Sequence, residues 1–429
     1  MVSLKKVLKK RLLRSVYHFL SSIVLYYKTV KYRKYIMKIE QDISRKERIK
    51  VVFLVVDVSM WKYDSLFKLM LSHPRFEPVI VSYIVKWEKK IDVVNQKNIV
   101  EYFKNKKKYP FIEGYNIDSN QWFDIKCEIQ PDIIFYAQPY RLPYSGYEVS
   151  NFYKKTLIVY SPYGPGIENK VWEYNSVTQN AAWRLFYATD FHLKNAQRMS
   201  FIRGKNVVVT GDLMLDVFKD DKRVVSDPWK ISDSCIKRII WAPHHSILEN
   251  DTLNYSNFLR ICDDMLNLAS KYRETVQFAF KPHPSLKPKL YSLSEWGIEK
   301  TNAYYQKWAN LPNSVLIEGD YVDLFLTSDA LIHDCSSFSV EYLYTQKPVM
   351  YITKEDHLDH LCDFGRLCFN MHYKGYTRED IDSFIENIIL KENDYKKSQR
   401  GEFFNQYLLP PHGKKASENI LDEILRALS

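Results

Sequence analysis

The stretch LIHDCSSFSVEYLYTQKPVMYI, residues 331–352, decides the fold class of this chain. An apolar strand ends in Asp-Cys-Ser-Ser, a helix starts at once, and a second apolar strand follows it. Strand, helix and strand joined by short connections are typical of the parallel βαβ unit. Three small polar side chains, Asp334, Ser336 and Ser337, stand where the helix opens. We therefore expect a parallel α/β sheet with polar groups at its carboxyl edge.

Polar side chains at a helix opening have two interpretations. The first N–H groups of a helix lack partners and the dipole is positive there, so Ser hydroxyls and free amides can bind a phosphate without a Gly-rich loop. Ordinary N-capping by Ser or Asp is the alternative. The phosphate interpretation gains weight when neighbouring strands end in polar groups as well, because parallel strands share one carboxyl edge.

The strand–helix alternation extends over the whole body of the chain. Near-continuous apolar runs predict ten strands, at 51–57, 78–84, 132–137, 156–161, 206–211, 238–243, 276–281, 314–318, 329–333 and 348–352. A polar stretch separates the first five from the last five. We predict two Rossmann-like domains with parallel sheets that face a central cleft. The predicted boundaries are 1–48 for an N-terminal arm, 49–218 for the first domain, 219–230 for a linker, 231–405 for the second domain, and 406–429 for a C-terminal helix that packs back on the body.

The net charge of +11 resides in the N-terminal arm. Residues 1–50 hold 15 Lys and Arg against 3 Asp and Glu, whereas the rest of the chain holds 47 against 48. A body so close to neutrality does not favour a nucleic-acid groove, and we expect no nucleic-acid partner.

The arm itself has an amphipathic pattern. Leu4, Val7, Leu8 and Leu12 recur at helical spacing among five Lys and Arg residues. The most apolar part, residues 16–27, is shorter than the roughly 20 residues that span a bilayer. We expect a helix that lies on an anionic membrane surface, with a basic helix packed on the body or a cleaved signal peptide as the alternatives.

Two further polar segments follow predicted strands in the second half. WAPHHS, residues 241–246, places His244 and His245 at one strand exit, where the pleat would turn only one of them into a site if the strand continued. KPHP, residues 281–284, brackets His283 with two prolines that stiffen the backbone on both sides. A rigid Lys and His pair at a strand exit suits catalysis or binding, while a plain rigid turn is the alternative.

Several site classes are disfavoured by the motifs that the sequence lacks. The six cysteines form no CxxC pair, which argues against structural zinc and against a disulfide framework. The chain has no Walker motif, GxGxxG, HExxH or GxSxG. NTPases, dehydrogenases, zinc hydrolases and α/β-hydrolases are therefore disfavoured, and no residues have metal-ligand spacing.

Taken together, the motifs resemble the CDP-glycerol glycerophosphotransferase family, which includes wall teichoic acid polymerases. That family has a K-x-H-P turn, an S-D-x-x-x-x-D-x-S-S segment followed by an acidic residue and K-P-V, and a C-terminal G-K-x-S. In this sequence they fall on 281–284, 328–349 and 413–417. The resemblance implies a GT-B fold and a peripheral enzyme on the inner face of the bacterial cell membrane. It also implies a CDP-glycerol or CDP-ribitol donor, a teichoic or capsular glycan or lipid-linked acceptor, and release of CMP. No cofactor is expected, and the need for a divalent metal stays open.

The resemblance also implies roles for individual residues. The second domain would take the donor and the first the acceptor. The expected catalytic residues are His283 and whichever of His244 and His245 faces the donor, one of them as general base. The remaining expected contacts are Lys281, Ser336, Ser337 and Arg366 to the donor phosphates, Asp334 and Glu341 to the nucleotide, and Tyr163 and Gly164 on the acceptor side.

The sequence departs from the family pattern in its first half. Teichoic acid polymerases carry a His-Gly-Thr turn there, and this chain has YSPYGPGIENK, residues 160–170, with no histidine. The segment TGDLMLD, residues 210–216, also lacks the Pro and Arg of the family's Gly-x-Pro-Arg-Asn-Asp. These differences keep open a GT-B glycosyltransferase or epimerase that uses a nucleotide sugar, and a membrane-bound scaffold without activity.

Overall fold

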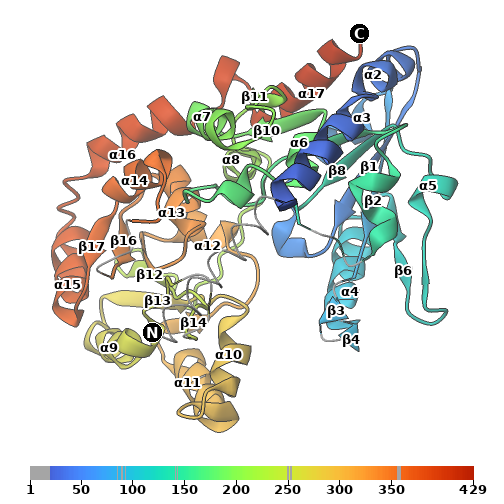
Figure 1. Cartoon of the computed structure of the whole chain (residues 1–429). Helices are drawn as coiled ribbons and strands as arrows, with labels where there is room; N and C mark the ends of the chain where they lie inside the picture. Colours follow the sequence, from blue (N-terminus) through green and yellow to red (C-terminus); the bar gives the residue numbers. More distant parts are fainter. Residues whose placement is uncertain are drawn as a thin grey trace, which may run out of the picture. The chain divides into compact units, whose positions relative to one another are not determined.

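The computed structural model describes residues 20–429, apart from 85, 88, 89, 92, 141, 143, 249, 250, 252, 253 and 355–358. These residues form two units, and most of their helices and strands are labelled in Figure 1. The first unit holds the described residues up to Tyr163, Lys170–Leu213 and Pro410–Ser429. The second holds Gly164–Asn169 and Met214–Leu409, so the chain passes from one unit to the other four times.

The first unit is built on a seven-stranded parallel sheet in the order β11-β10-β9-β8-β1-β2-β5. The strands are β1 (Ile49–Val55), β2 (Phe76–Ser82), β5 (Phe111–Glu113), β8 (Ile133–Tyr136), β9 (Leu157–Tyr160), β10 (Arg184–Tyr187) and β11 (Val207–Val209). Alternate residues of β1 enter two different cores, Phe53 on one face and Leu54 on the other. Helices cover both faces, which explains the near-continuous apolar runs.

The helices of the first unit are α2 (Ile36–Ser44), α3 (Asp64–Ser72), α4 (Val93–Val100), α5 (Ile125–Glu128), α6 (Val177–Ala181), α7 (Asp190–Met199) and α17 (Ala416–Ala427). Helix α8 (Leu213–Phe218) begins at the crossing into the second unit. Two short antiparallel pairs lie outside the main sheet, β3 with β4 (Lys86–Trp87 and Lys90–Ile91) and β6 with β7 (Tyr115–Asn116 and Gln121–Trp122).

The second unit repeats the design with a six-stranded parallel sheet in the order β14-β13-β12-β15-β16-β17. Its strands are β12 (Lys237–Ala242), β13 (Val276–Phe280), β14 (Ser314–Leu316), β15 (Ala330–His333), β16 (Val349–Ile352) and β17 (Tyr373–Gly375). Its helices are α9 (Phe258–Lys271), α10 (Leu286–Ser292), α11 (Gly297–Asn310), α12 (Val322–Thr327), α13 (Phe338–Glu341), α14 (Asp363–Asn370), α15 (Arg378–Ser383) and α16 (Lys397–Phe403). The central strand β12 pairs with both β13 and β15, which places the ends of all three side by side.

All ten predicted strands are present, each shifted by one to three residues at most. The two short antiparallel pairs were not predicted, and neither were three strands of the two main sheets, β5, β10 and β17. Strands β5 and β17 are three-residue strands at the sheet edges. Strand β10 is internal, but its run of four residues starts with Arg184 and follows a short helix, so no long apolar run marks it.

The N-terminal arm is only partly within the described residues, because residues 1–19 lie outside them. Residues 20–33 are helical and α2 follows. Ile39 and Ile43 of α2 are buried in a core of the first unit, and Arg33 donates a hydrogen bond to the carbonyl of Ala182 at 2.7 Å. The end of the arm is therefore part of the first unit. In the described part of the chain, no helix has the length and apolar content needed to cross a membrane.

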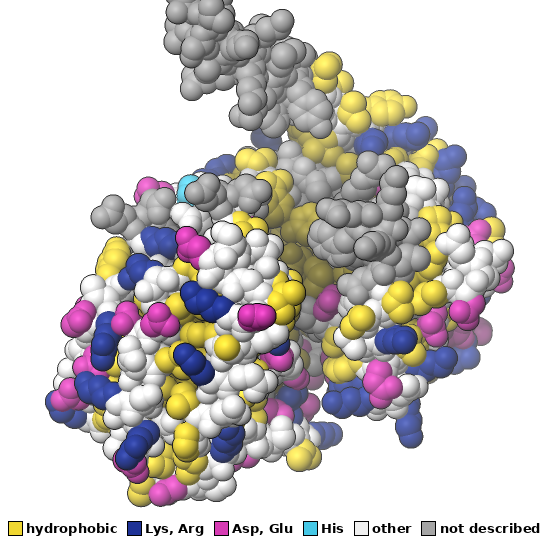
Figure 2. Space-filling model, turned by 90° about the horizontal axis from the view of Figure 1, so that it is seen from below, with side chains coloured by type: hydrophobic (Ala, Val, Ile, Leu, Met, Phe, Trp, Pro, Cys, Tyr) yellow, Lys and Arg dark blue, Asp and Glu magenta, His cyan; other side chains and the backbone are white. Residues whose placement is uncertain are grey.

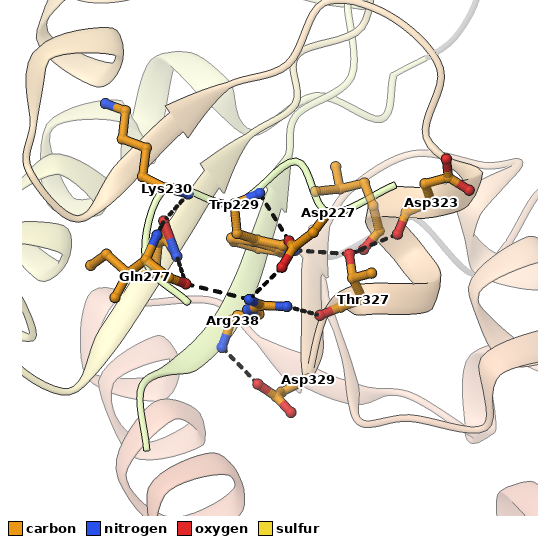
Figure 3. Close-up of polar contacts among 10 residues, drawn as sticks. Asp227, Trp229, Lys230, Arg238, Gln277, Asp323, Thr327 and Asp329 are labelled. Carbon is orange, nitrogen blue, oxygen red and sulfur yellow. Dashed lines mark hydrogen bonds and ion pairs between the residues drawn. The ribbon is translucent and has the colours of Figure 1, made fainter. Parts of the chain in front are cut away.

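The predicted linker, 219–230, lies within the second unit and is fastened to the amino edge of its sheet (Figure 3). Arg223 donates to Asp323 at 2.7 Å, and the indole of Trp229 donates to Thr327 at 2.9 Å. The backbone N–H of Lys230 donates to the buried Gln277 at 2.7 Å. Polar residues of this segment hydrogen-bond to polar groups near the starts of the strands. Their composition therefore resembles that of a linker, although the segment is part of the second unit.

The C-terminal helix α17 completes the first unit. Ile420 and Ile424 are fully buried in the same core as β1, and α17 packs on α3. The side chain of Asn419 donates to the carbonyl of Thr210 at 3.1 Å, which joins the two family-like segments around 210–216 and 413–417.

On the face of the molecule shown in Figure 2, Lys and Arg side chains are interspersed with Asp and Glu side chains over the described residues.

Candidate functional site: three histidines at the edge of the second sheet

Three histidines from two adjacent strand exits meet at the carboxyl edge of the second sheet. The ring centroids of His244 and His245 lie 4.2 Å apart, and those of His245 and His283 lie 4.3 Å apart. His244 and His283 are separated by 5.4 Å. We call these residues the histidine cluster. Because β12 ends at Ala242, the strand does not continue through His244 and His245, so the condition under which only one of them would enter a site does not hold.

The Nδ1 atom of every histidine in the cluster faces a hydrogen-bond donor, which is a backbone N–H for His244 and His283 and a lysine side chain for His245. The backbone N–H of Ser246 donates to His244 at 3.2 Å, and the backbone N–H of Ser285 donates to His283 at 3.1 Å. The ammonium of Lys289 lies 3.0 Å from Nδ1 of His245. A neutral imidazole carries one proton, so in all three rings that proton is on Nε2.

This protonation pattern defines what the cluster can bind. Three ring nitrogens, one from each histidine, lie within 4.8 Å of one another, a spacing compatible with a metal ion. Metal coordination through Nε2 would require the proton on Nδ1, where each ring faces a fixed donor. In this protonation state the three rings do not offer their Nε2 lone pairs to a metal. Three Nε2–H groups are instead hydrogen-bond donors, and they suit an anion such as phosphate.

Burial keeps the histidine cluster neutral. Desolvation, reinforced by the neighbouring histidines, lowers the pKa of His244 to about 2 and that of His283 to about 3. Burial and the charge of Lys289 lower the pKa of His245 as well. A neutral ring with its only lone pair already used is not a general base, so the role of proton acceptor predicted for these histidines is not supported. Their geometry supports phosphate binding.

We predict that this burial makes the second unit acid-labile. His333 and His372 are also buried, and burial lowers both pKa values, that of His372 to about 3. In the unfolded chain these rings bind protons near pH 6.5, whereas in the folded state they stay neutral. The free energy of unfolding therefore falls as the pH falls through 6.5. Each of the four rings whose pKa is strongly lowered, those of His244, His283, His333 and His372, contributes about 0.7 kcal/mol between pH 7 and pH 6, on the order of 3 kcal/mol together.

Asp334 opposes this trend only slightly. Burial raises its pKa to about 6, so the folded state gains a proton as the pH falls to that value. The measurement is hydrogen exchange of β12 and β15 peptides in urea at pH 7 and pH 6. The double variant H244Q/H283Q should lose about half of the pH effect. Equal stability at the two pH values would contradict the assignment of neutral buried rings.

Lys281 is a buried cation for which no described residue serves as counter-ion. Its side chain is 5% exposed, and among the described residues its ammonium makes no hydrogen bond or ion pair. Burial lowers its pKa, while the more distant charges of Cys335, Asp320 and Glu318 act in the opposite direction. An unpaired buried charge destabilises a fold, so its presence here favours an anionic ligand.

Ser336 and Ser337 follow β15 and precede α13. Both are partly exposed, and neither hydroxyl has a hydrogen-bond partner among the described residues. Ser337 occupies the N-cap position of α13 but its side chain caps nothing. Ordinary N-capping therefore does not explain this pair, and both hydroxyls remain available to a ligand.

Asp334 is buried below the histidine cluster and hydrogen-bonds to the backbone of two neighbouring segments. Its two carboxylate oxygens accept the backbone N–H of His244 at 2.6 Å and of Asn257 at 2.5 Å, and the residue is 1% exposed. It connects the exits of β12 and β15 to the start of α9. The structure gives Asp334 a positioning role and does not support the predicted nucleotide contact.

The other predicted site residues are spread more widely. Glu341 is 2% exposed and accepts a hydrogen bond from the hydroxyl of Tyr321. Arg366 is exposed on α14, and its Nε donates to the carbonyl of Leu361 at 3.3 Å, with no contact to the histidine cluster within the described residues. Tyr163 belongs to the first unit and Gly164 to the second. A side chain at Gly164 would meet no atom within 4 Å, so close packing does not require glycine there.

Part of the family-like segment is structural. The ammonium of Lys347 donates to three carbonyls at the end of α12, among them Leu326 at 2.7 Å. Asp329 accepts the backbone N–H of Arg238 at 2.7 Å at the amino edge of the sheet. The serine pair thus differs from Asp329 and Lys347 of the same motif, since neither serine hydroxyl has a partner among the described residues.

Sequence reasoning missed the residues that orient the cluster. Ser246 Oγ accepts the backbone N–H of Tyr255 at 2.9 Å and contacts Nδ1 of His244 at 2.8 Å. Tyr255 in turn packs edge-on against the His244 ring and donates to Glu168. Lys289 pairs with Asp251 behind His245. Only Ser246 carried a signal, as part of the quoted WAPHHS, while the others lie in loops or helices with no motif.

The comparison with known families bears on this site directly. Residues 170–426, more than half of the chain, match the family described as CDP-glycerol:poly(glycerophosphate) glycerophosphotransferase. The chain belongs to this family. The histidine cluster, Lys281 and the serine pair all lie within the matched range, so the polyol-phosphate transferase class inferred from their motifs is confirmed at the level of the family. No curated protein matches the sequence.

Solved structures establish the GT-B type fold of this family member. A wall teichoic acid polymerase TagF variant aligns with a TM-score of 0.56 at 15% identity, over 97% of each chain. UDP-GlcNAc 2-epimerase from Neisseria meningitidis, bound to UDP-GlcNAc, aligns with a TM-score of 0.59 at 16% identity, over 88% of this chain and 100% of that one. The S. aureus MnaA–UDP complex aligns with a TM-score of 0.54 at 15% identity, over 88% of this chain and 96% of that one. At such identities the likeness is one of fold.

Proposed function

We propose that this protein transfers glycerol phosphate or ribitol phosphate from a CDP-activated donor to a hydroxyl group of a teichoic or capsular glycan, free or lipid-linked, and releases CMP. The observation that carries the proposal is the set of unpaired donors at one sheet edge. Three Nε2–H groups, the ammonium of Lys281 and two Ser hydroxyls come from three adjacent strand exits. A pyrophosphate is the part of such a donor that needs this many hydrogen bonds and positive charge.

The chemistry assigns each group a task. The acceptor oxygen attacks the phosphorus that carries the polyol, a new P–O bond forms, and the bond to the bridging oxygen breaks. CMP leaves with that electron pair, and negative charge grows on its phosphate. Neutral imidazole N–H groups and Lys281 stabilise this charge without giving up a proton. The acceptor proton goes to another base, and a loose phosphoryl-transfer transition state asks little of that base.

No cofactor has a role in this scheme, and the pattern of ring protonation in the histidine cluster supports anion binding without a metal. Divalent ions can still accompany a pyrophosphate substrate. We therefore propose that activity survives chelation, and the assay below includes an arm with EDTA.

The test is an assay of CMP release by the full chain. CDP-glycerol, CDP-ribitol, UDP-GlcNAc and UDP-glucose are each supplied with a teichoic acid fragment as acceptor, and the elongated product is identified by mass spectrometry. CMP release with one CDP-polyol, slowed about 100-fold or more in H283N, supports the proposal. Transfer of a sugar with release of UDP, and no CMP, would overturn it in favour of a glycosyltransferase. Binding and turnover of no donor would favour a scaffold.

We also propose that the protein acts at the inner face of the bacterial cell membrane, on an anionic lipid surface. An apolar stripe on the helix of residues 20–33 supports this: Leu20, Ile23, Val24, Tyr27 and Val30 are 50–64% exposed. Lys28 and Lys31 lie on the same helix, beside the basic residues that precede it in sequence. Sedimentation with vesicles of phosphatidylglycerol should capture the protein in low salt. Equal capture by phosphatidylcholine vesicles, or capture undiminished in L20E/V24E, would contradict this role for the stripe.

A further inference from the structure

Three aromatic side chains at the carboxyl edge of the first sheet have no task in the donor site. Tyr140 follows β8, Tyr163 follows β9, and Trp172 lies just beyond the segment that visits the second unit. The rings of Tyr140 and Trp172 are 5.8 Å apart at an angle of 47°, and the hydroxyl oxygens of the two tyrosines are 3.4 Å apart. We call these three residues the aromatic platform.

The aromatic platform faces solvent although its side chains are large and largely apolar. Tyr140 is 41% exposed and Trp172 is 50% exposed. In a soluble protein, exposed aromatic side chains that gather in one place mark a binding surface more often than single ones do. The position agrees with this, since ligands of parallel sheets bind beyond the carboxyl ends of the strands.

The fold holds the base of the platform rigid. Strands β8 and β9 are neighbours, with Tyr136 paired to Tyr160 at their ends. The buried hydroxyl of Tyr63 lies 2.9 Å from the carbonyl oxygen of Tyr136, to which it donates, and accepts the backbone N–H of Ser161 at 3.0 Å. One side chain thus joins the two strand ends that carry Tyr140 and Tyr163. A rigid surface loses little conformational freedom when a ligand binds.

The chemistry of the platform selects a class of ligand. Its broad ring faces are apolar, and its polar groups lie at the ring edges: two phenol hydroxyls and the indole N–H of Trp172, which donates no hydrogen bond within the described residues. Lys170 adds a positive charge 5.6 Å from the Trp172 ring centroid. A pyranose ring has a matching form, with an apolar C–H face and hydroxyls around its rim, whereas an open polyol chain has no flat apolar face.

We propose that the aromatic platform binds a sugar ring of the acceptor, so that the acceptor carries a pyranose next to the attacking hydroxyl rather than a bare polyol phosphate chain. The identification of this sugar as part of the acceptor rests on the proposed function. The binding of a sugar ring by the aromatic platform does not depend on it. Lys170 would lie near a phosphate attached to that sugar, as charge complementarity requires.

The experiment is saturation-transfer NMR with the full chain and four probes: methyl β-D-glucopyranoside, methyl N-acetyl-β-D-glucosaminide, glycerol 3-phosphate and CMP. We expect saturation on the ring C–H protons of at least one glycoside, a drop of at least fivefold in W172A, and substantial recovery in W172F. Y395A removes a ring that is 70% exposed in the second unit and serves as the matched control, with no change expected. Glycerol 3-phosphate should show no loss of signal in W172A.

The outcomes separate this proposal from the proposed function. Undiminished glycoside signals in W172A, no signal from either glycoside, or a W172A loss confined to CMP would overturn the platform as a sugar site. Binding of CDP-glycerol and release of CMP are measured on the same samples. A platform that binds glycosides in a protein that releases no CMP would leave the sugar site standing and remove the phosphotransferase.

Discussion

Replacing His283 by asparagine is expected to slow CMP release about 10²- to 10³-fold, while glutamine should retain a large part of the activity. The size is that of losing one preorganised donor to a developing negative charge. Asparagine places its amide near Nδ1 of the histidine and leaves nothing at Nε2. Glutamine places an amide N–H near Nε2, which is the atom that carries the proton in this structure. The order of the two variants therefore reports on a donor role.

The measurement is kcat and KM for CDP-glycerol with both variants under identical conditions, together with the pH profile. A general base would make glutamine and asparagine equally poor and would give the wild type a pH dependence that both variants lack. Either result would contradict our assignment. H360Q, a change at an exposed histidine elsewhere in the second unit, is the control, with turnover within about twofold of the wild type.

Replacing Lys281 by methionine is expected to make the protein more stable and nearly inactive at the same time. Methionine has a similar length and needs no counter-ion, so the penalty of the unpaired buried ammonium disappears, on the order of 1 kcal/mol in favour of the folded state. For a unit of this size such a gain raises the melting temperature by a few degrees. Loss of the charge from the phosphate site should reduce turnover by about 10²-fold or more.

The pH dependence gives this prediction a second signature. Burial lowers the pKa of Lys281, so the folded state disfavours its charged form over the whole range below the ordinary value of 10.5. The stability advantage of K281M is therefore greatest near neutral pH and fades as the pH approaches that value.

K287M in the next helix is the matched control for K281M. Lys287 pairs with Glu318 at 3.7 Å and lies over the ring of Tyr305, so its loss should not stabilise the fold. A destabilised K281M with normal turnover would show that the ammonium of Lys281 has a structural partner.

The ten strands with continuous apolar runs could be predicted because strands buried on both faces leave little room for polar residues. Strands β5 and β17 contain only three residues each at sheet edges, where one side of the strand needs no apolar partner. The amino edge misled the prediction for 219–230, since the side chains of Arg223 and Ser226 that hydrogen-bond to Asp323 are of the polar kind that a free linker would also have.

The site could be located from sequence but its chemistry could not be assigned. Strand exits and the family resemblance identified His244, His245 and His283, and the sheet order brings them together. The tautomer of each ring depends on which donor faces Nδ1. For His245 that donor is Lys289, which lies 44 positions away in the sequence, and no local sequence pattern predicts this contact. Similarly, Asp334 appeared to be a ligand contact because its two backbone partners lie far along the chain.

The return of α17 to the first unit has a consequence for the order in which the protein is made. The core of the first unit includes Ala416, Ile420, Ile424 and Leu428, and the carbonyl of Leu428 accepts a hydrogen bond from Arg75 at 2.7 Å. On the ribosome, residues 214–409 emerge before these side chains exist, so the second unit can bury its core first. The first unit, although it begins earlier, waits with part of its sheet uncovered until residue 428 has emerged. We therefore expect the second unit to complete its core before the first, the reverse of the usual order in which the N-terminal domain folds first.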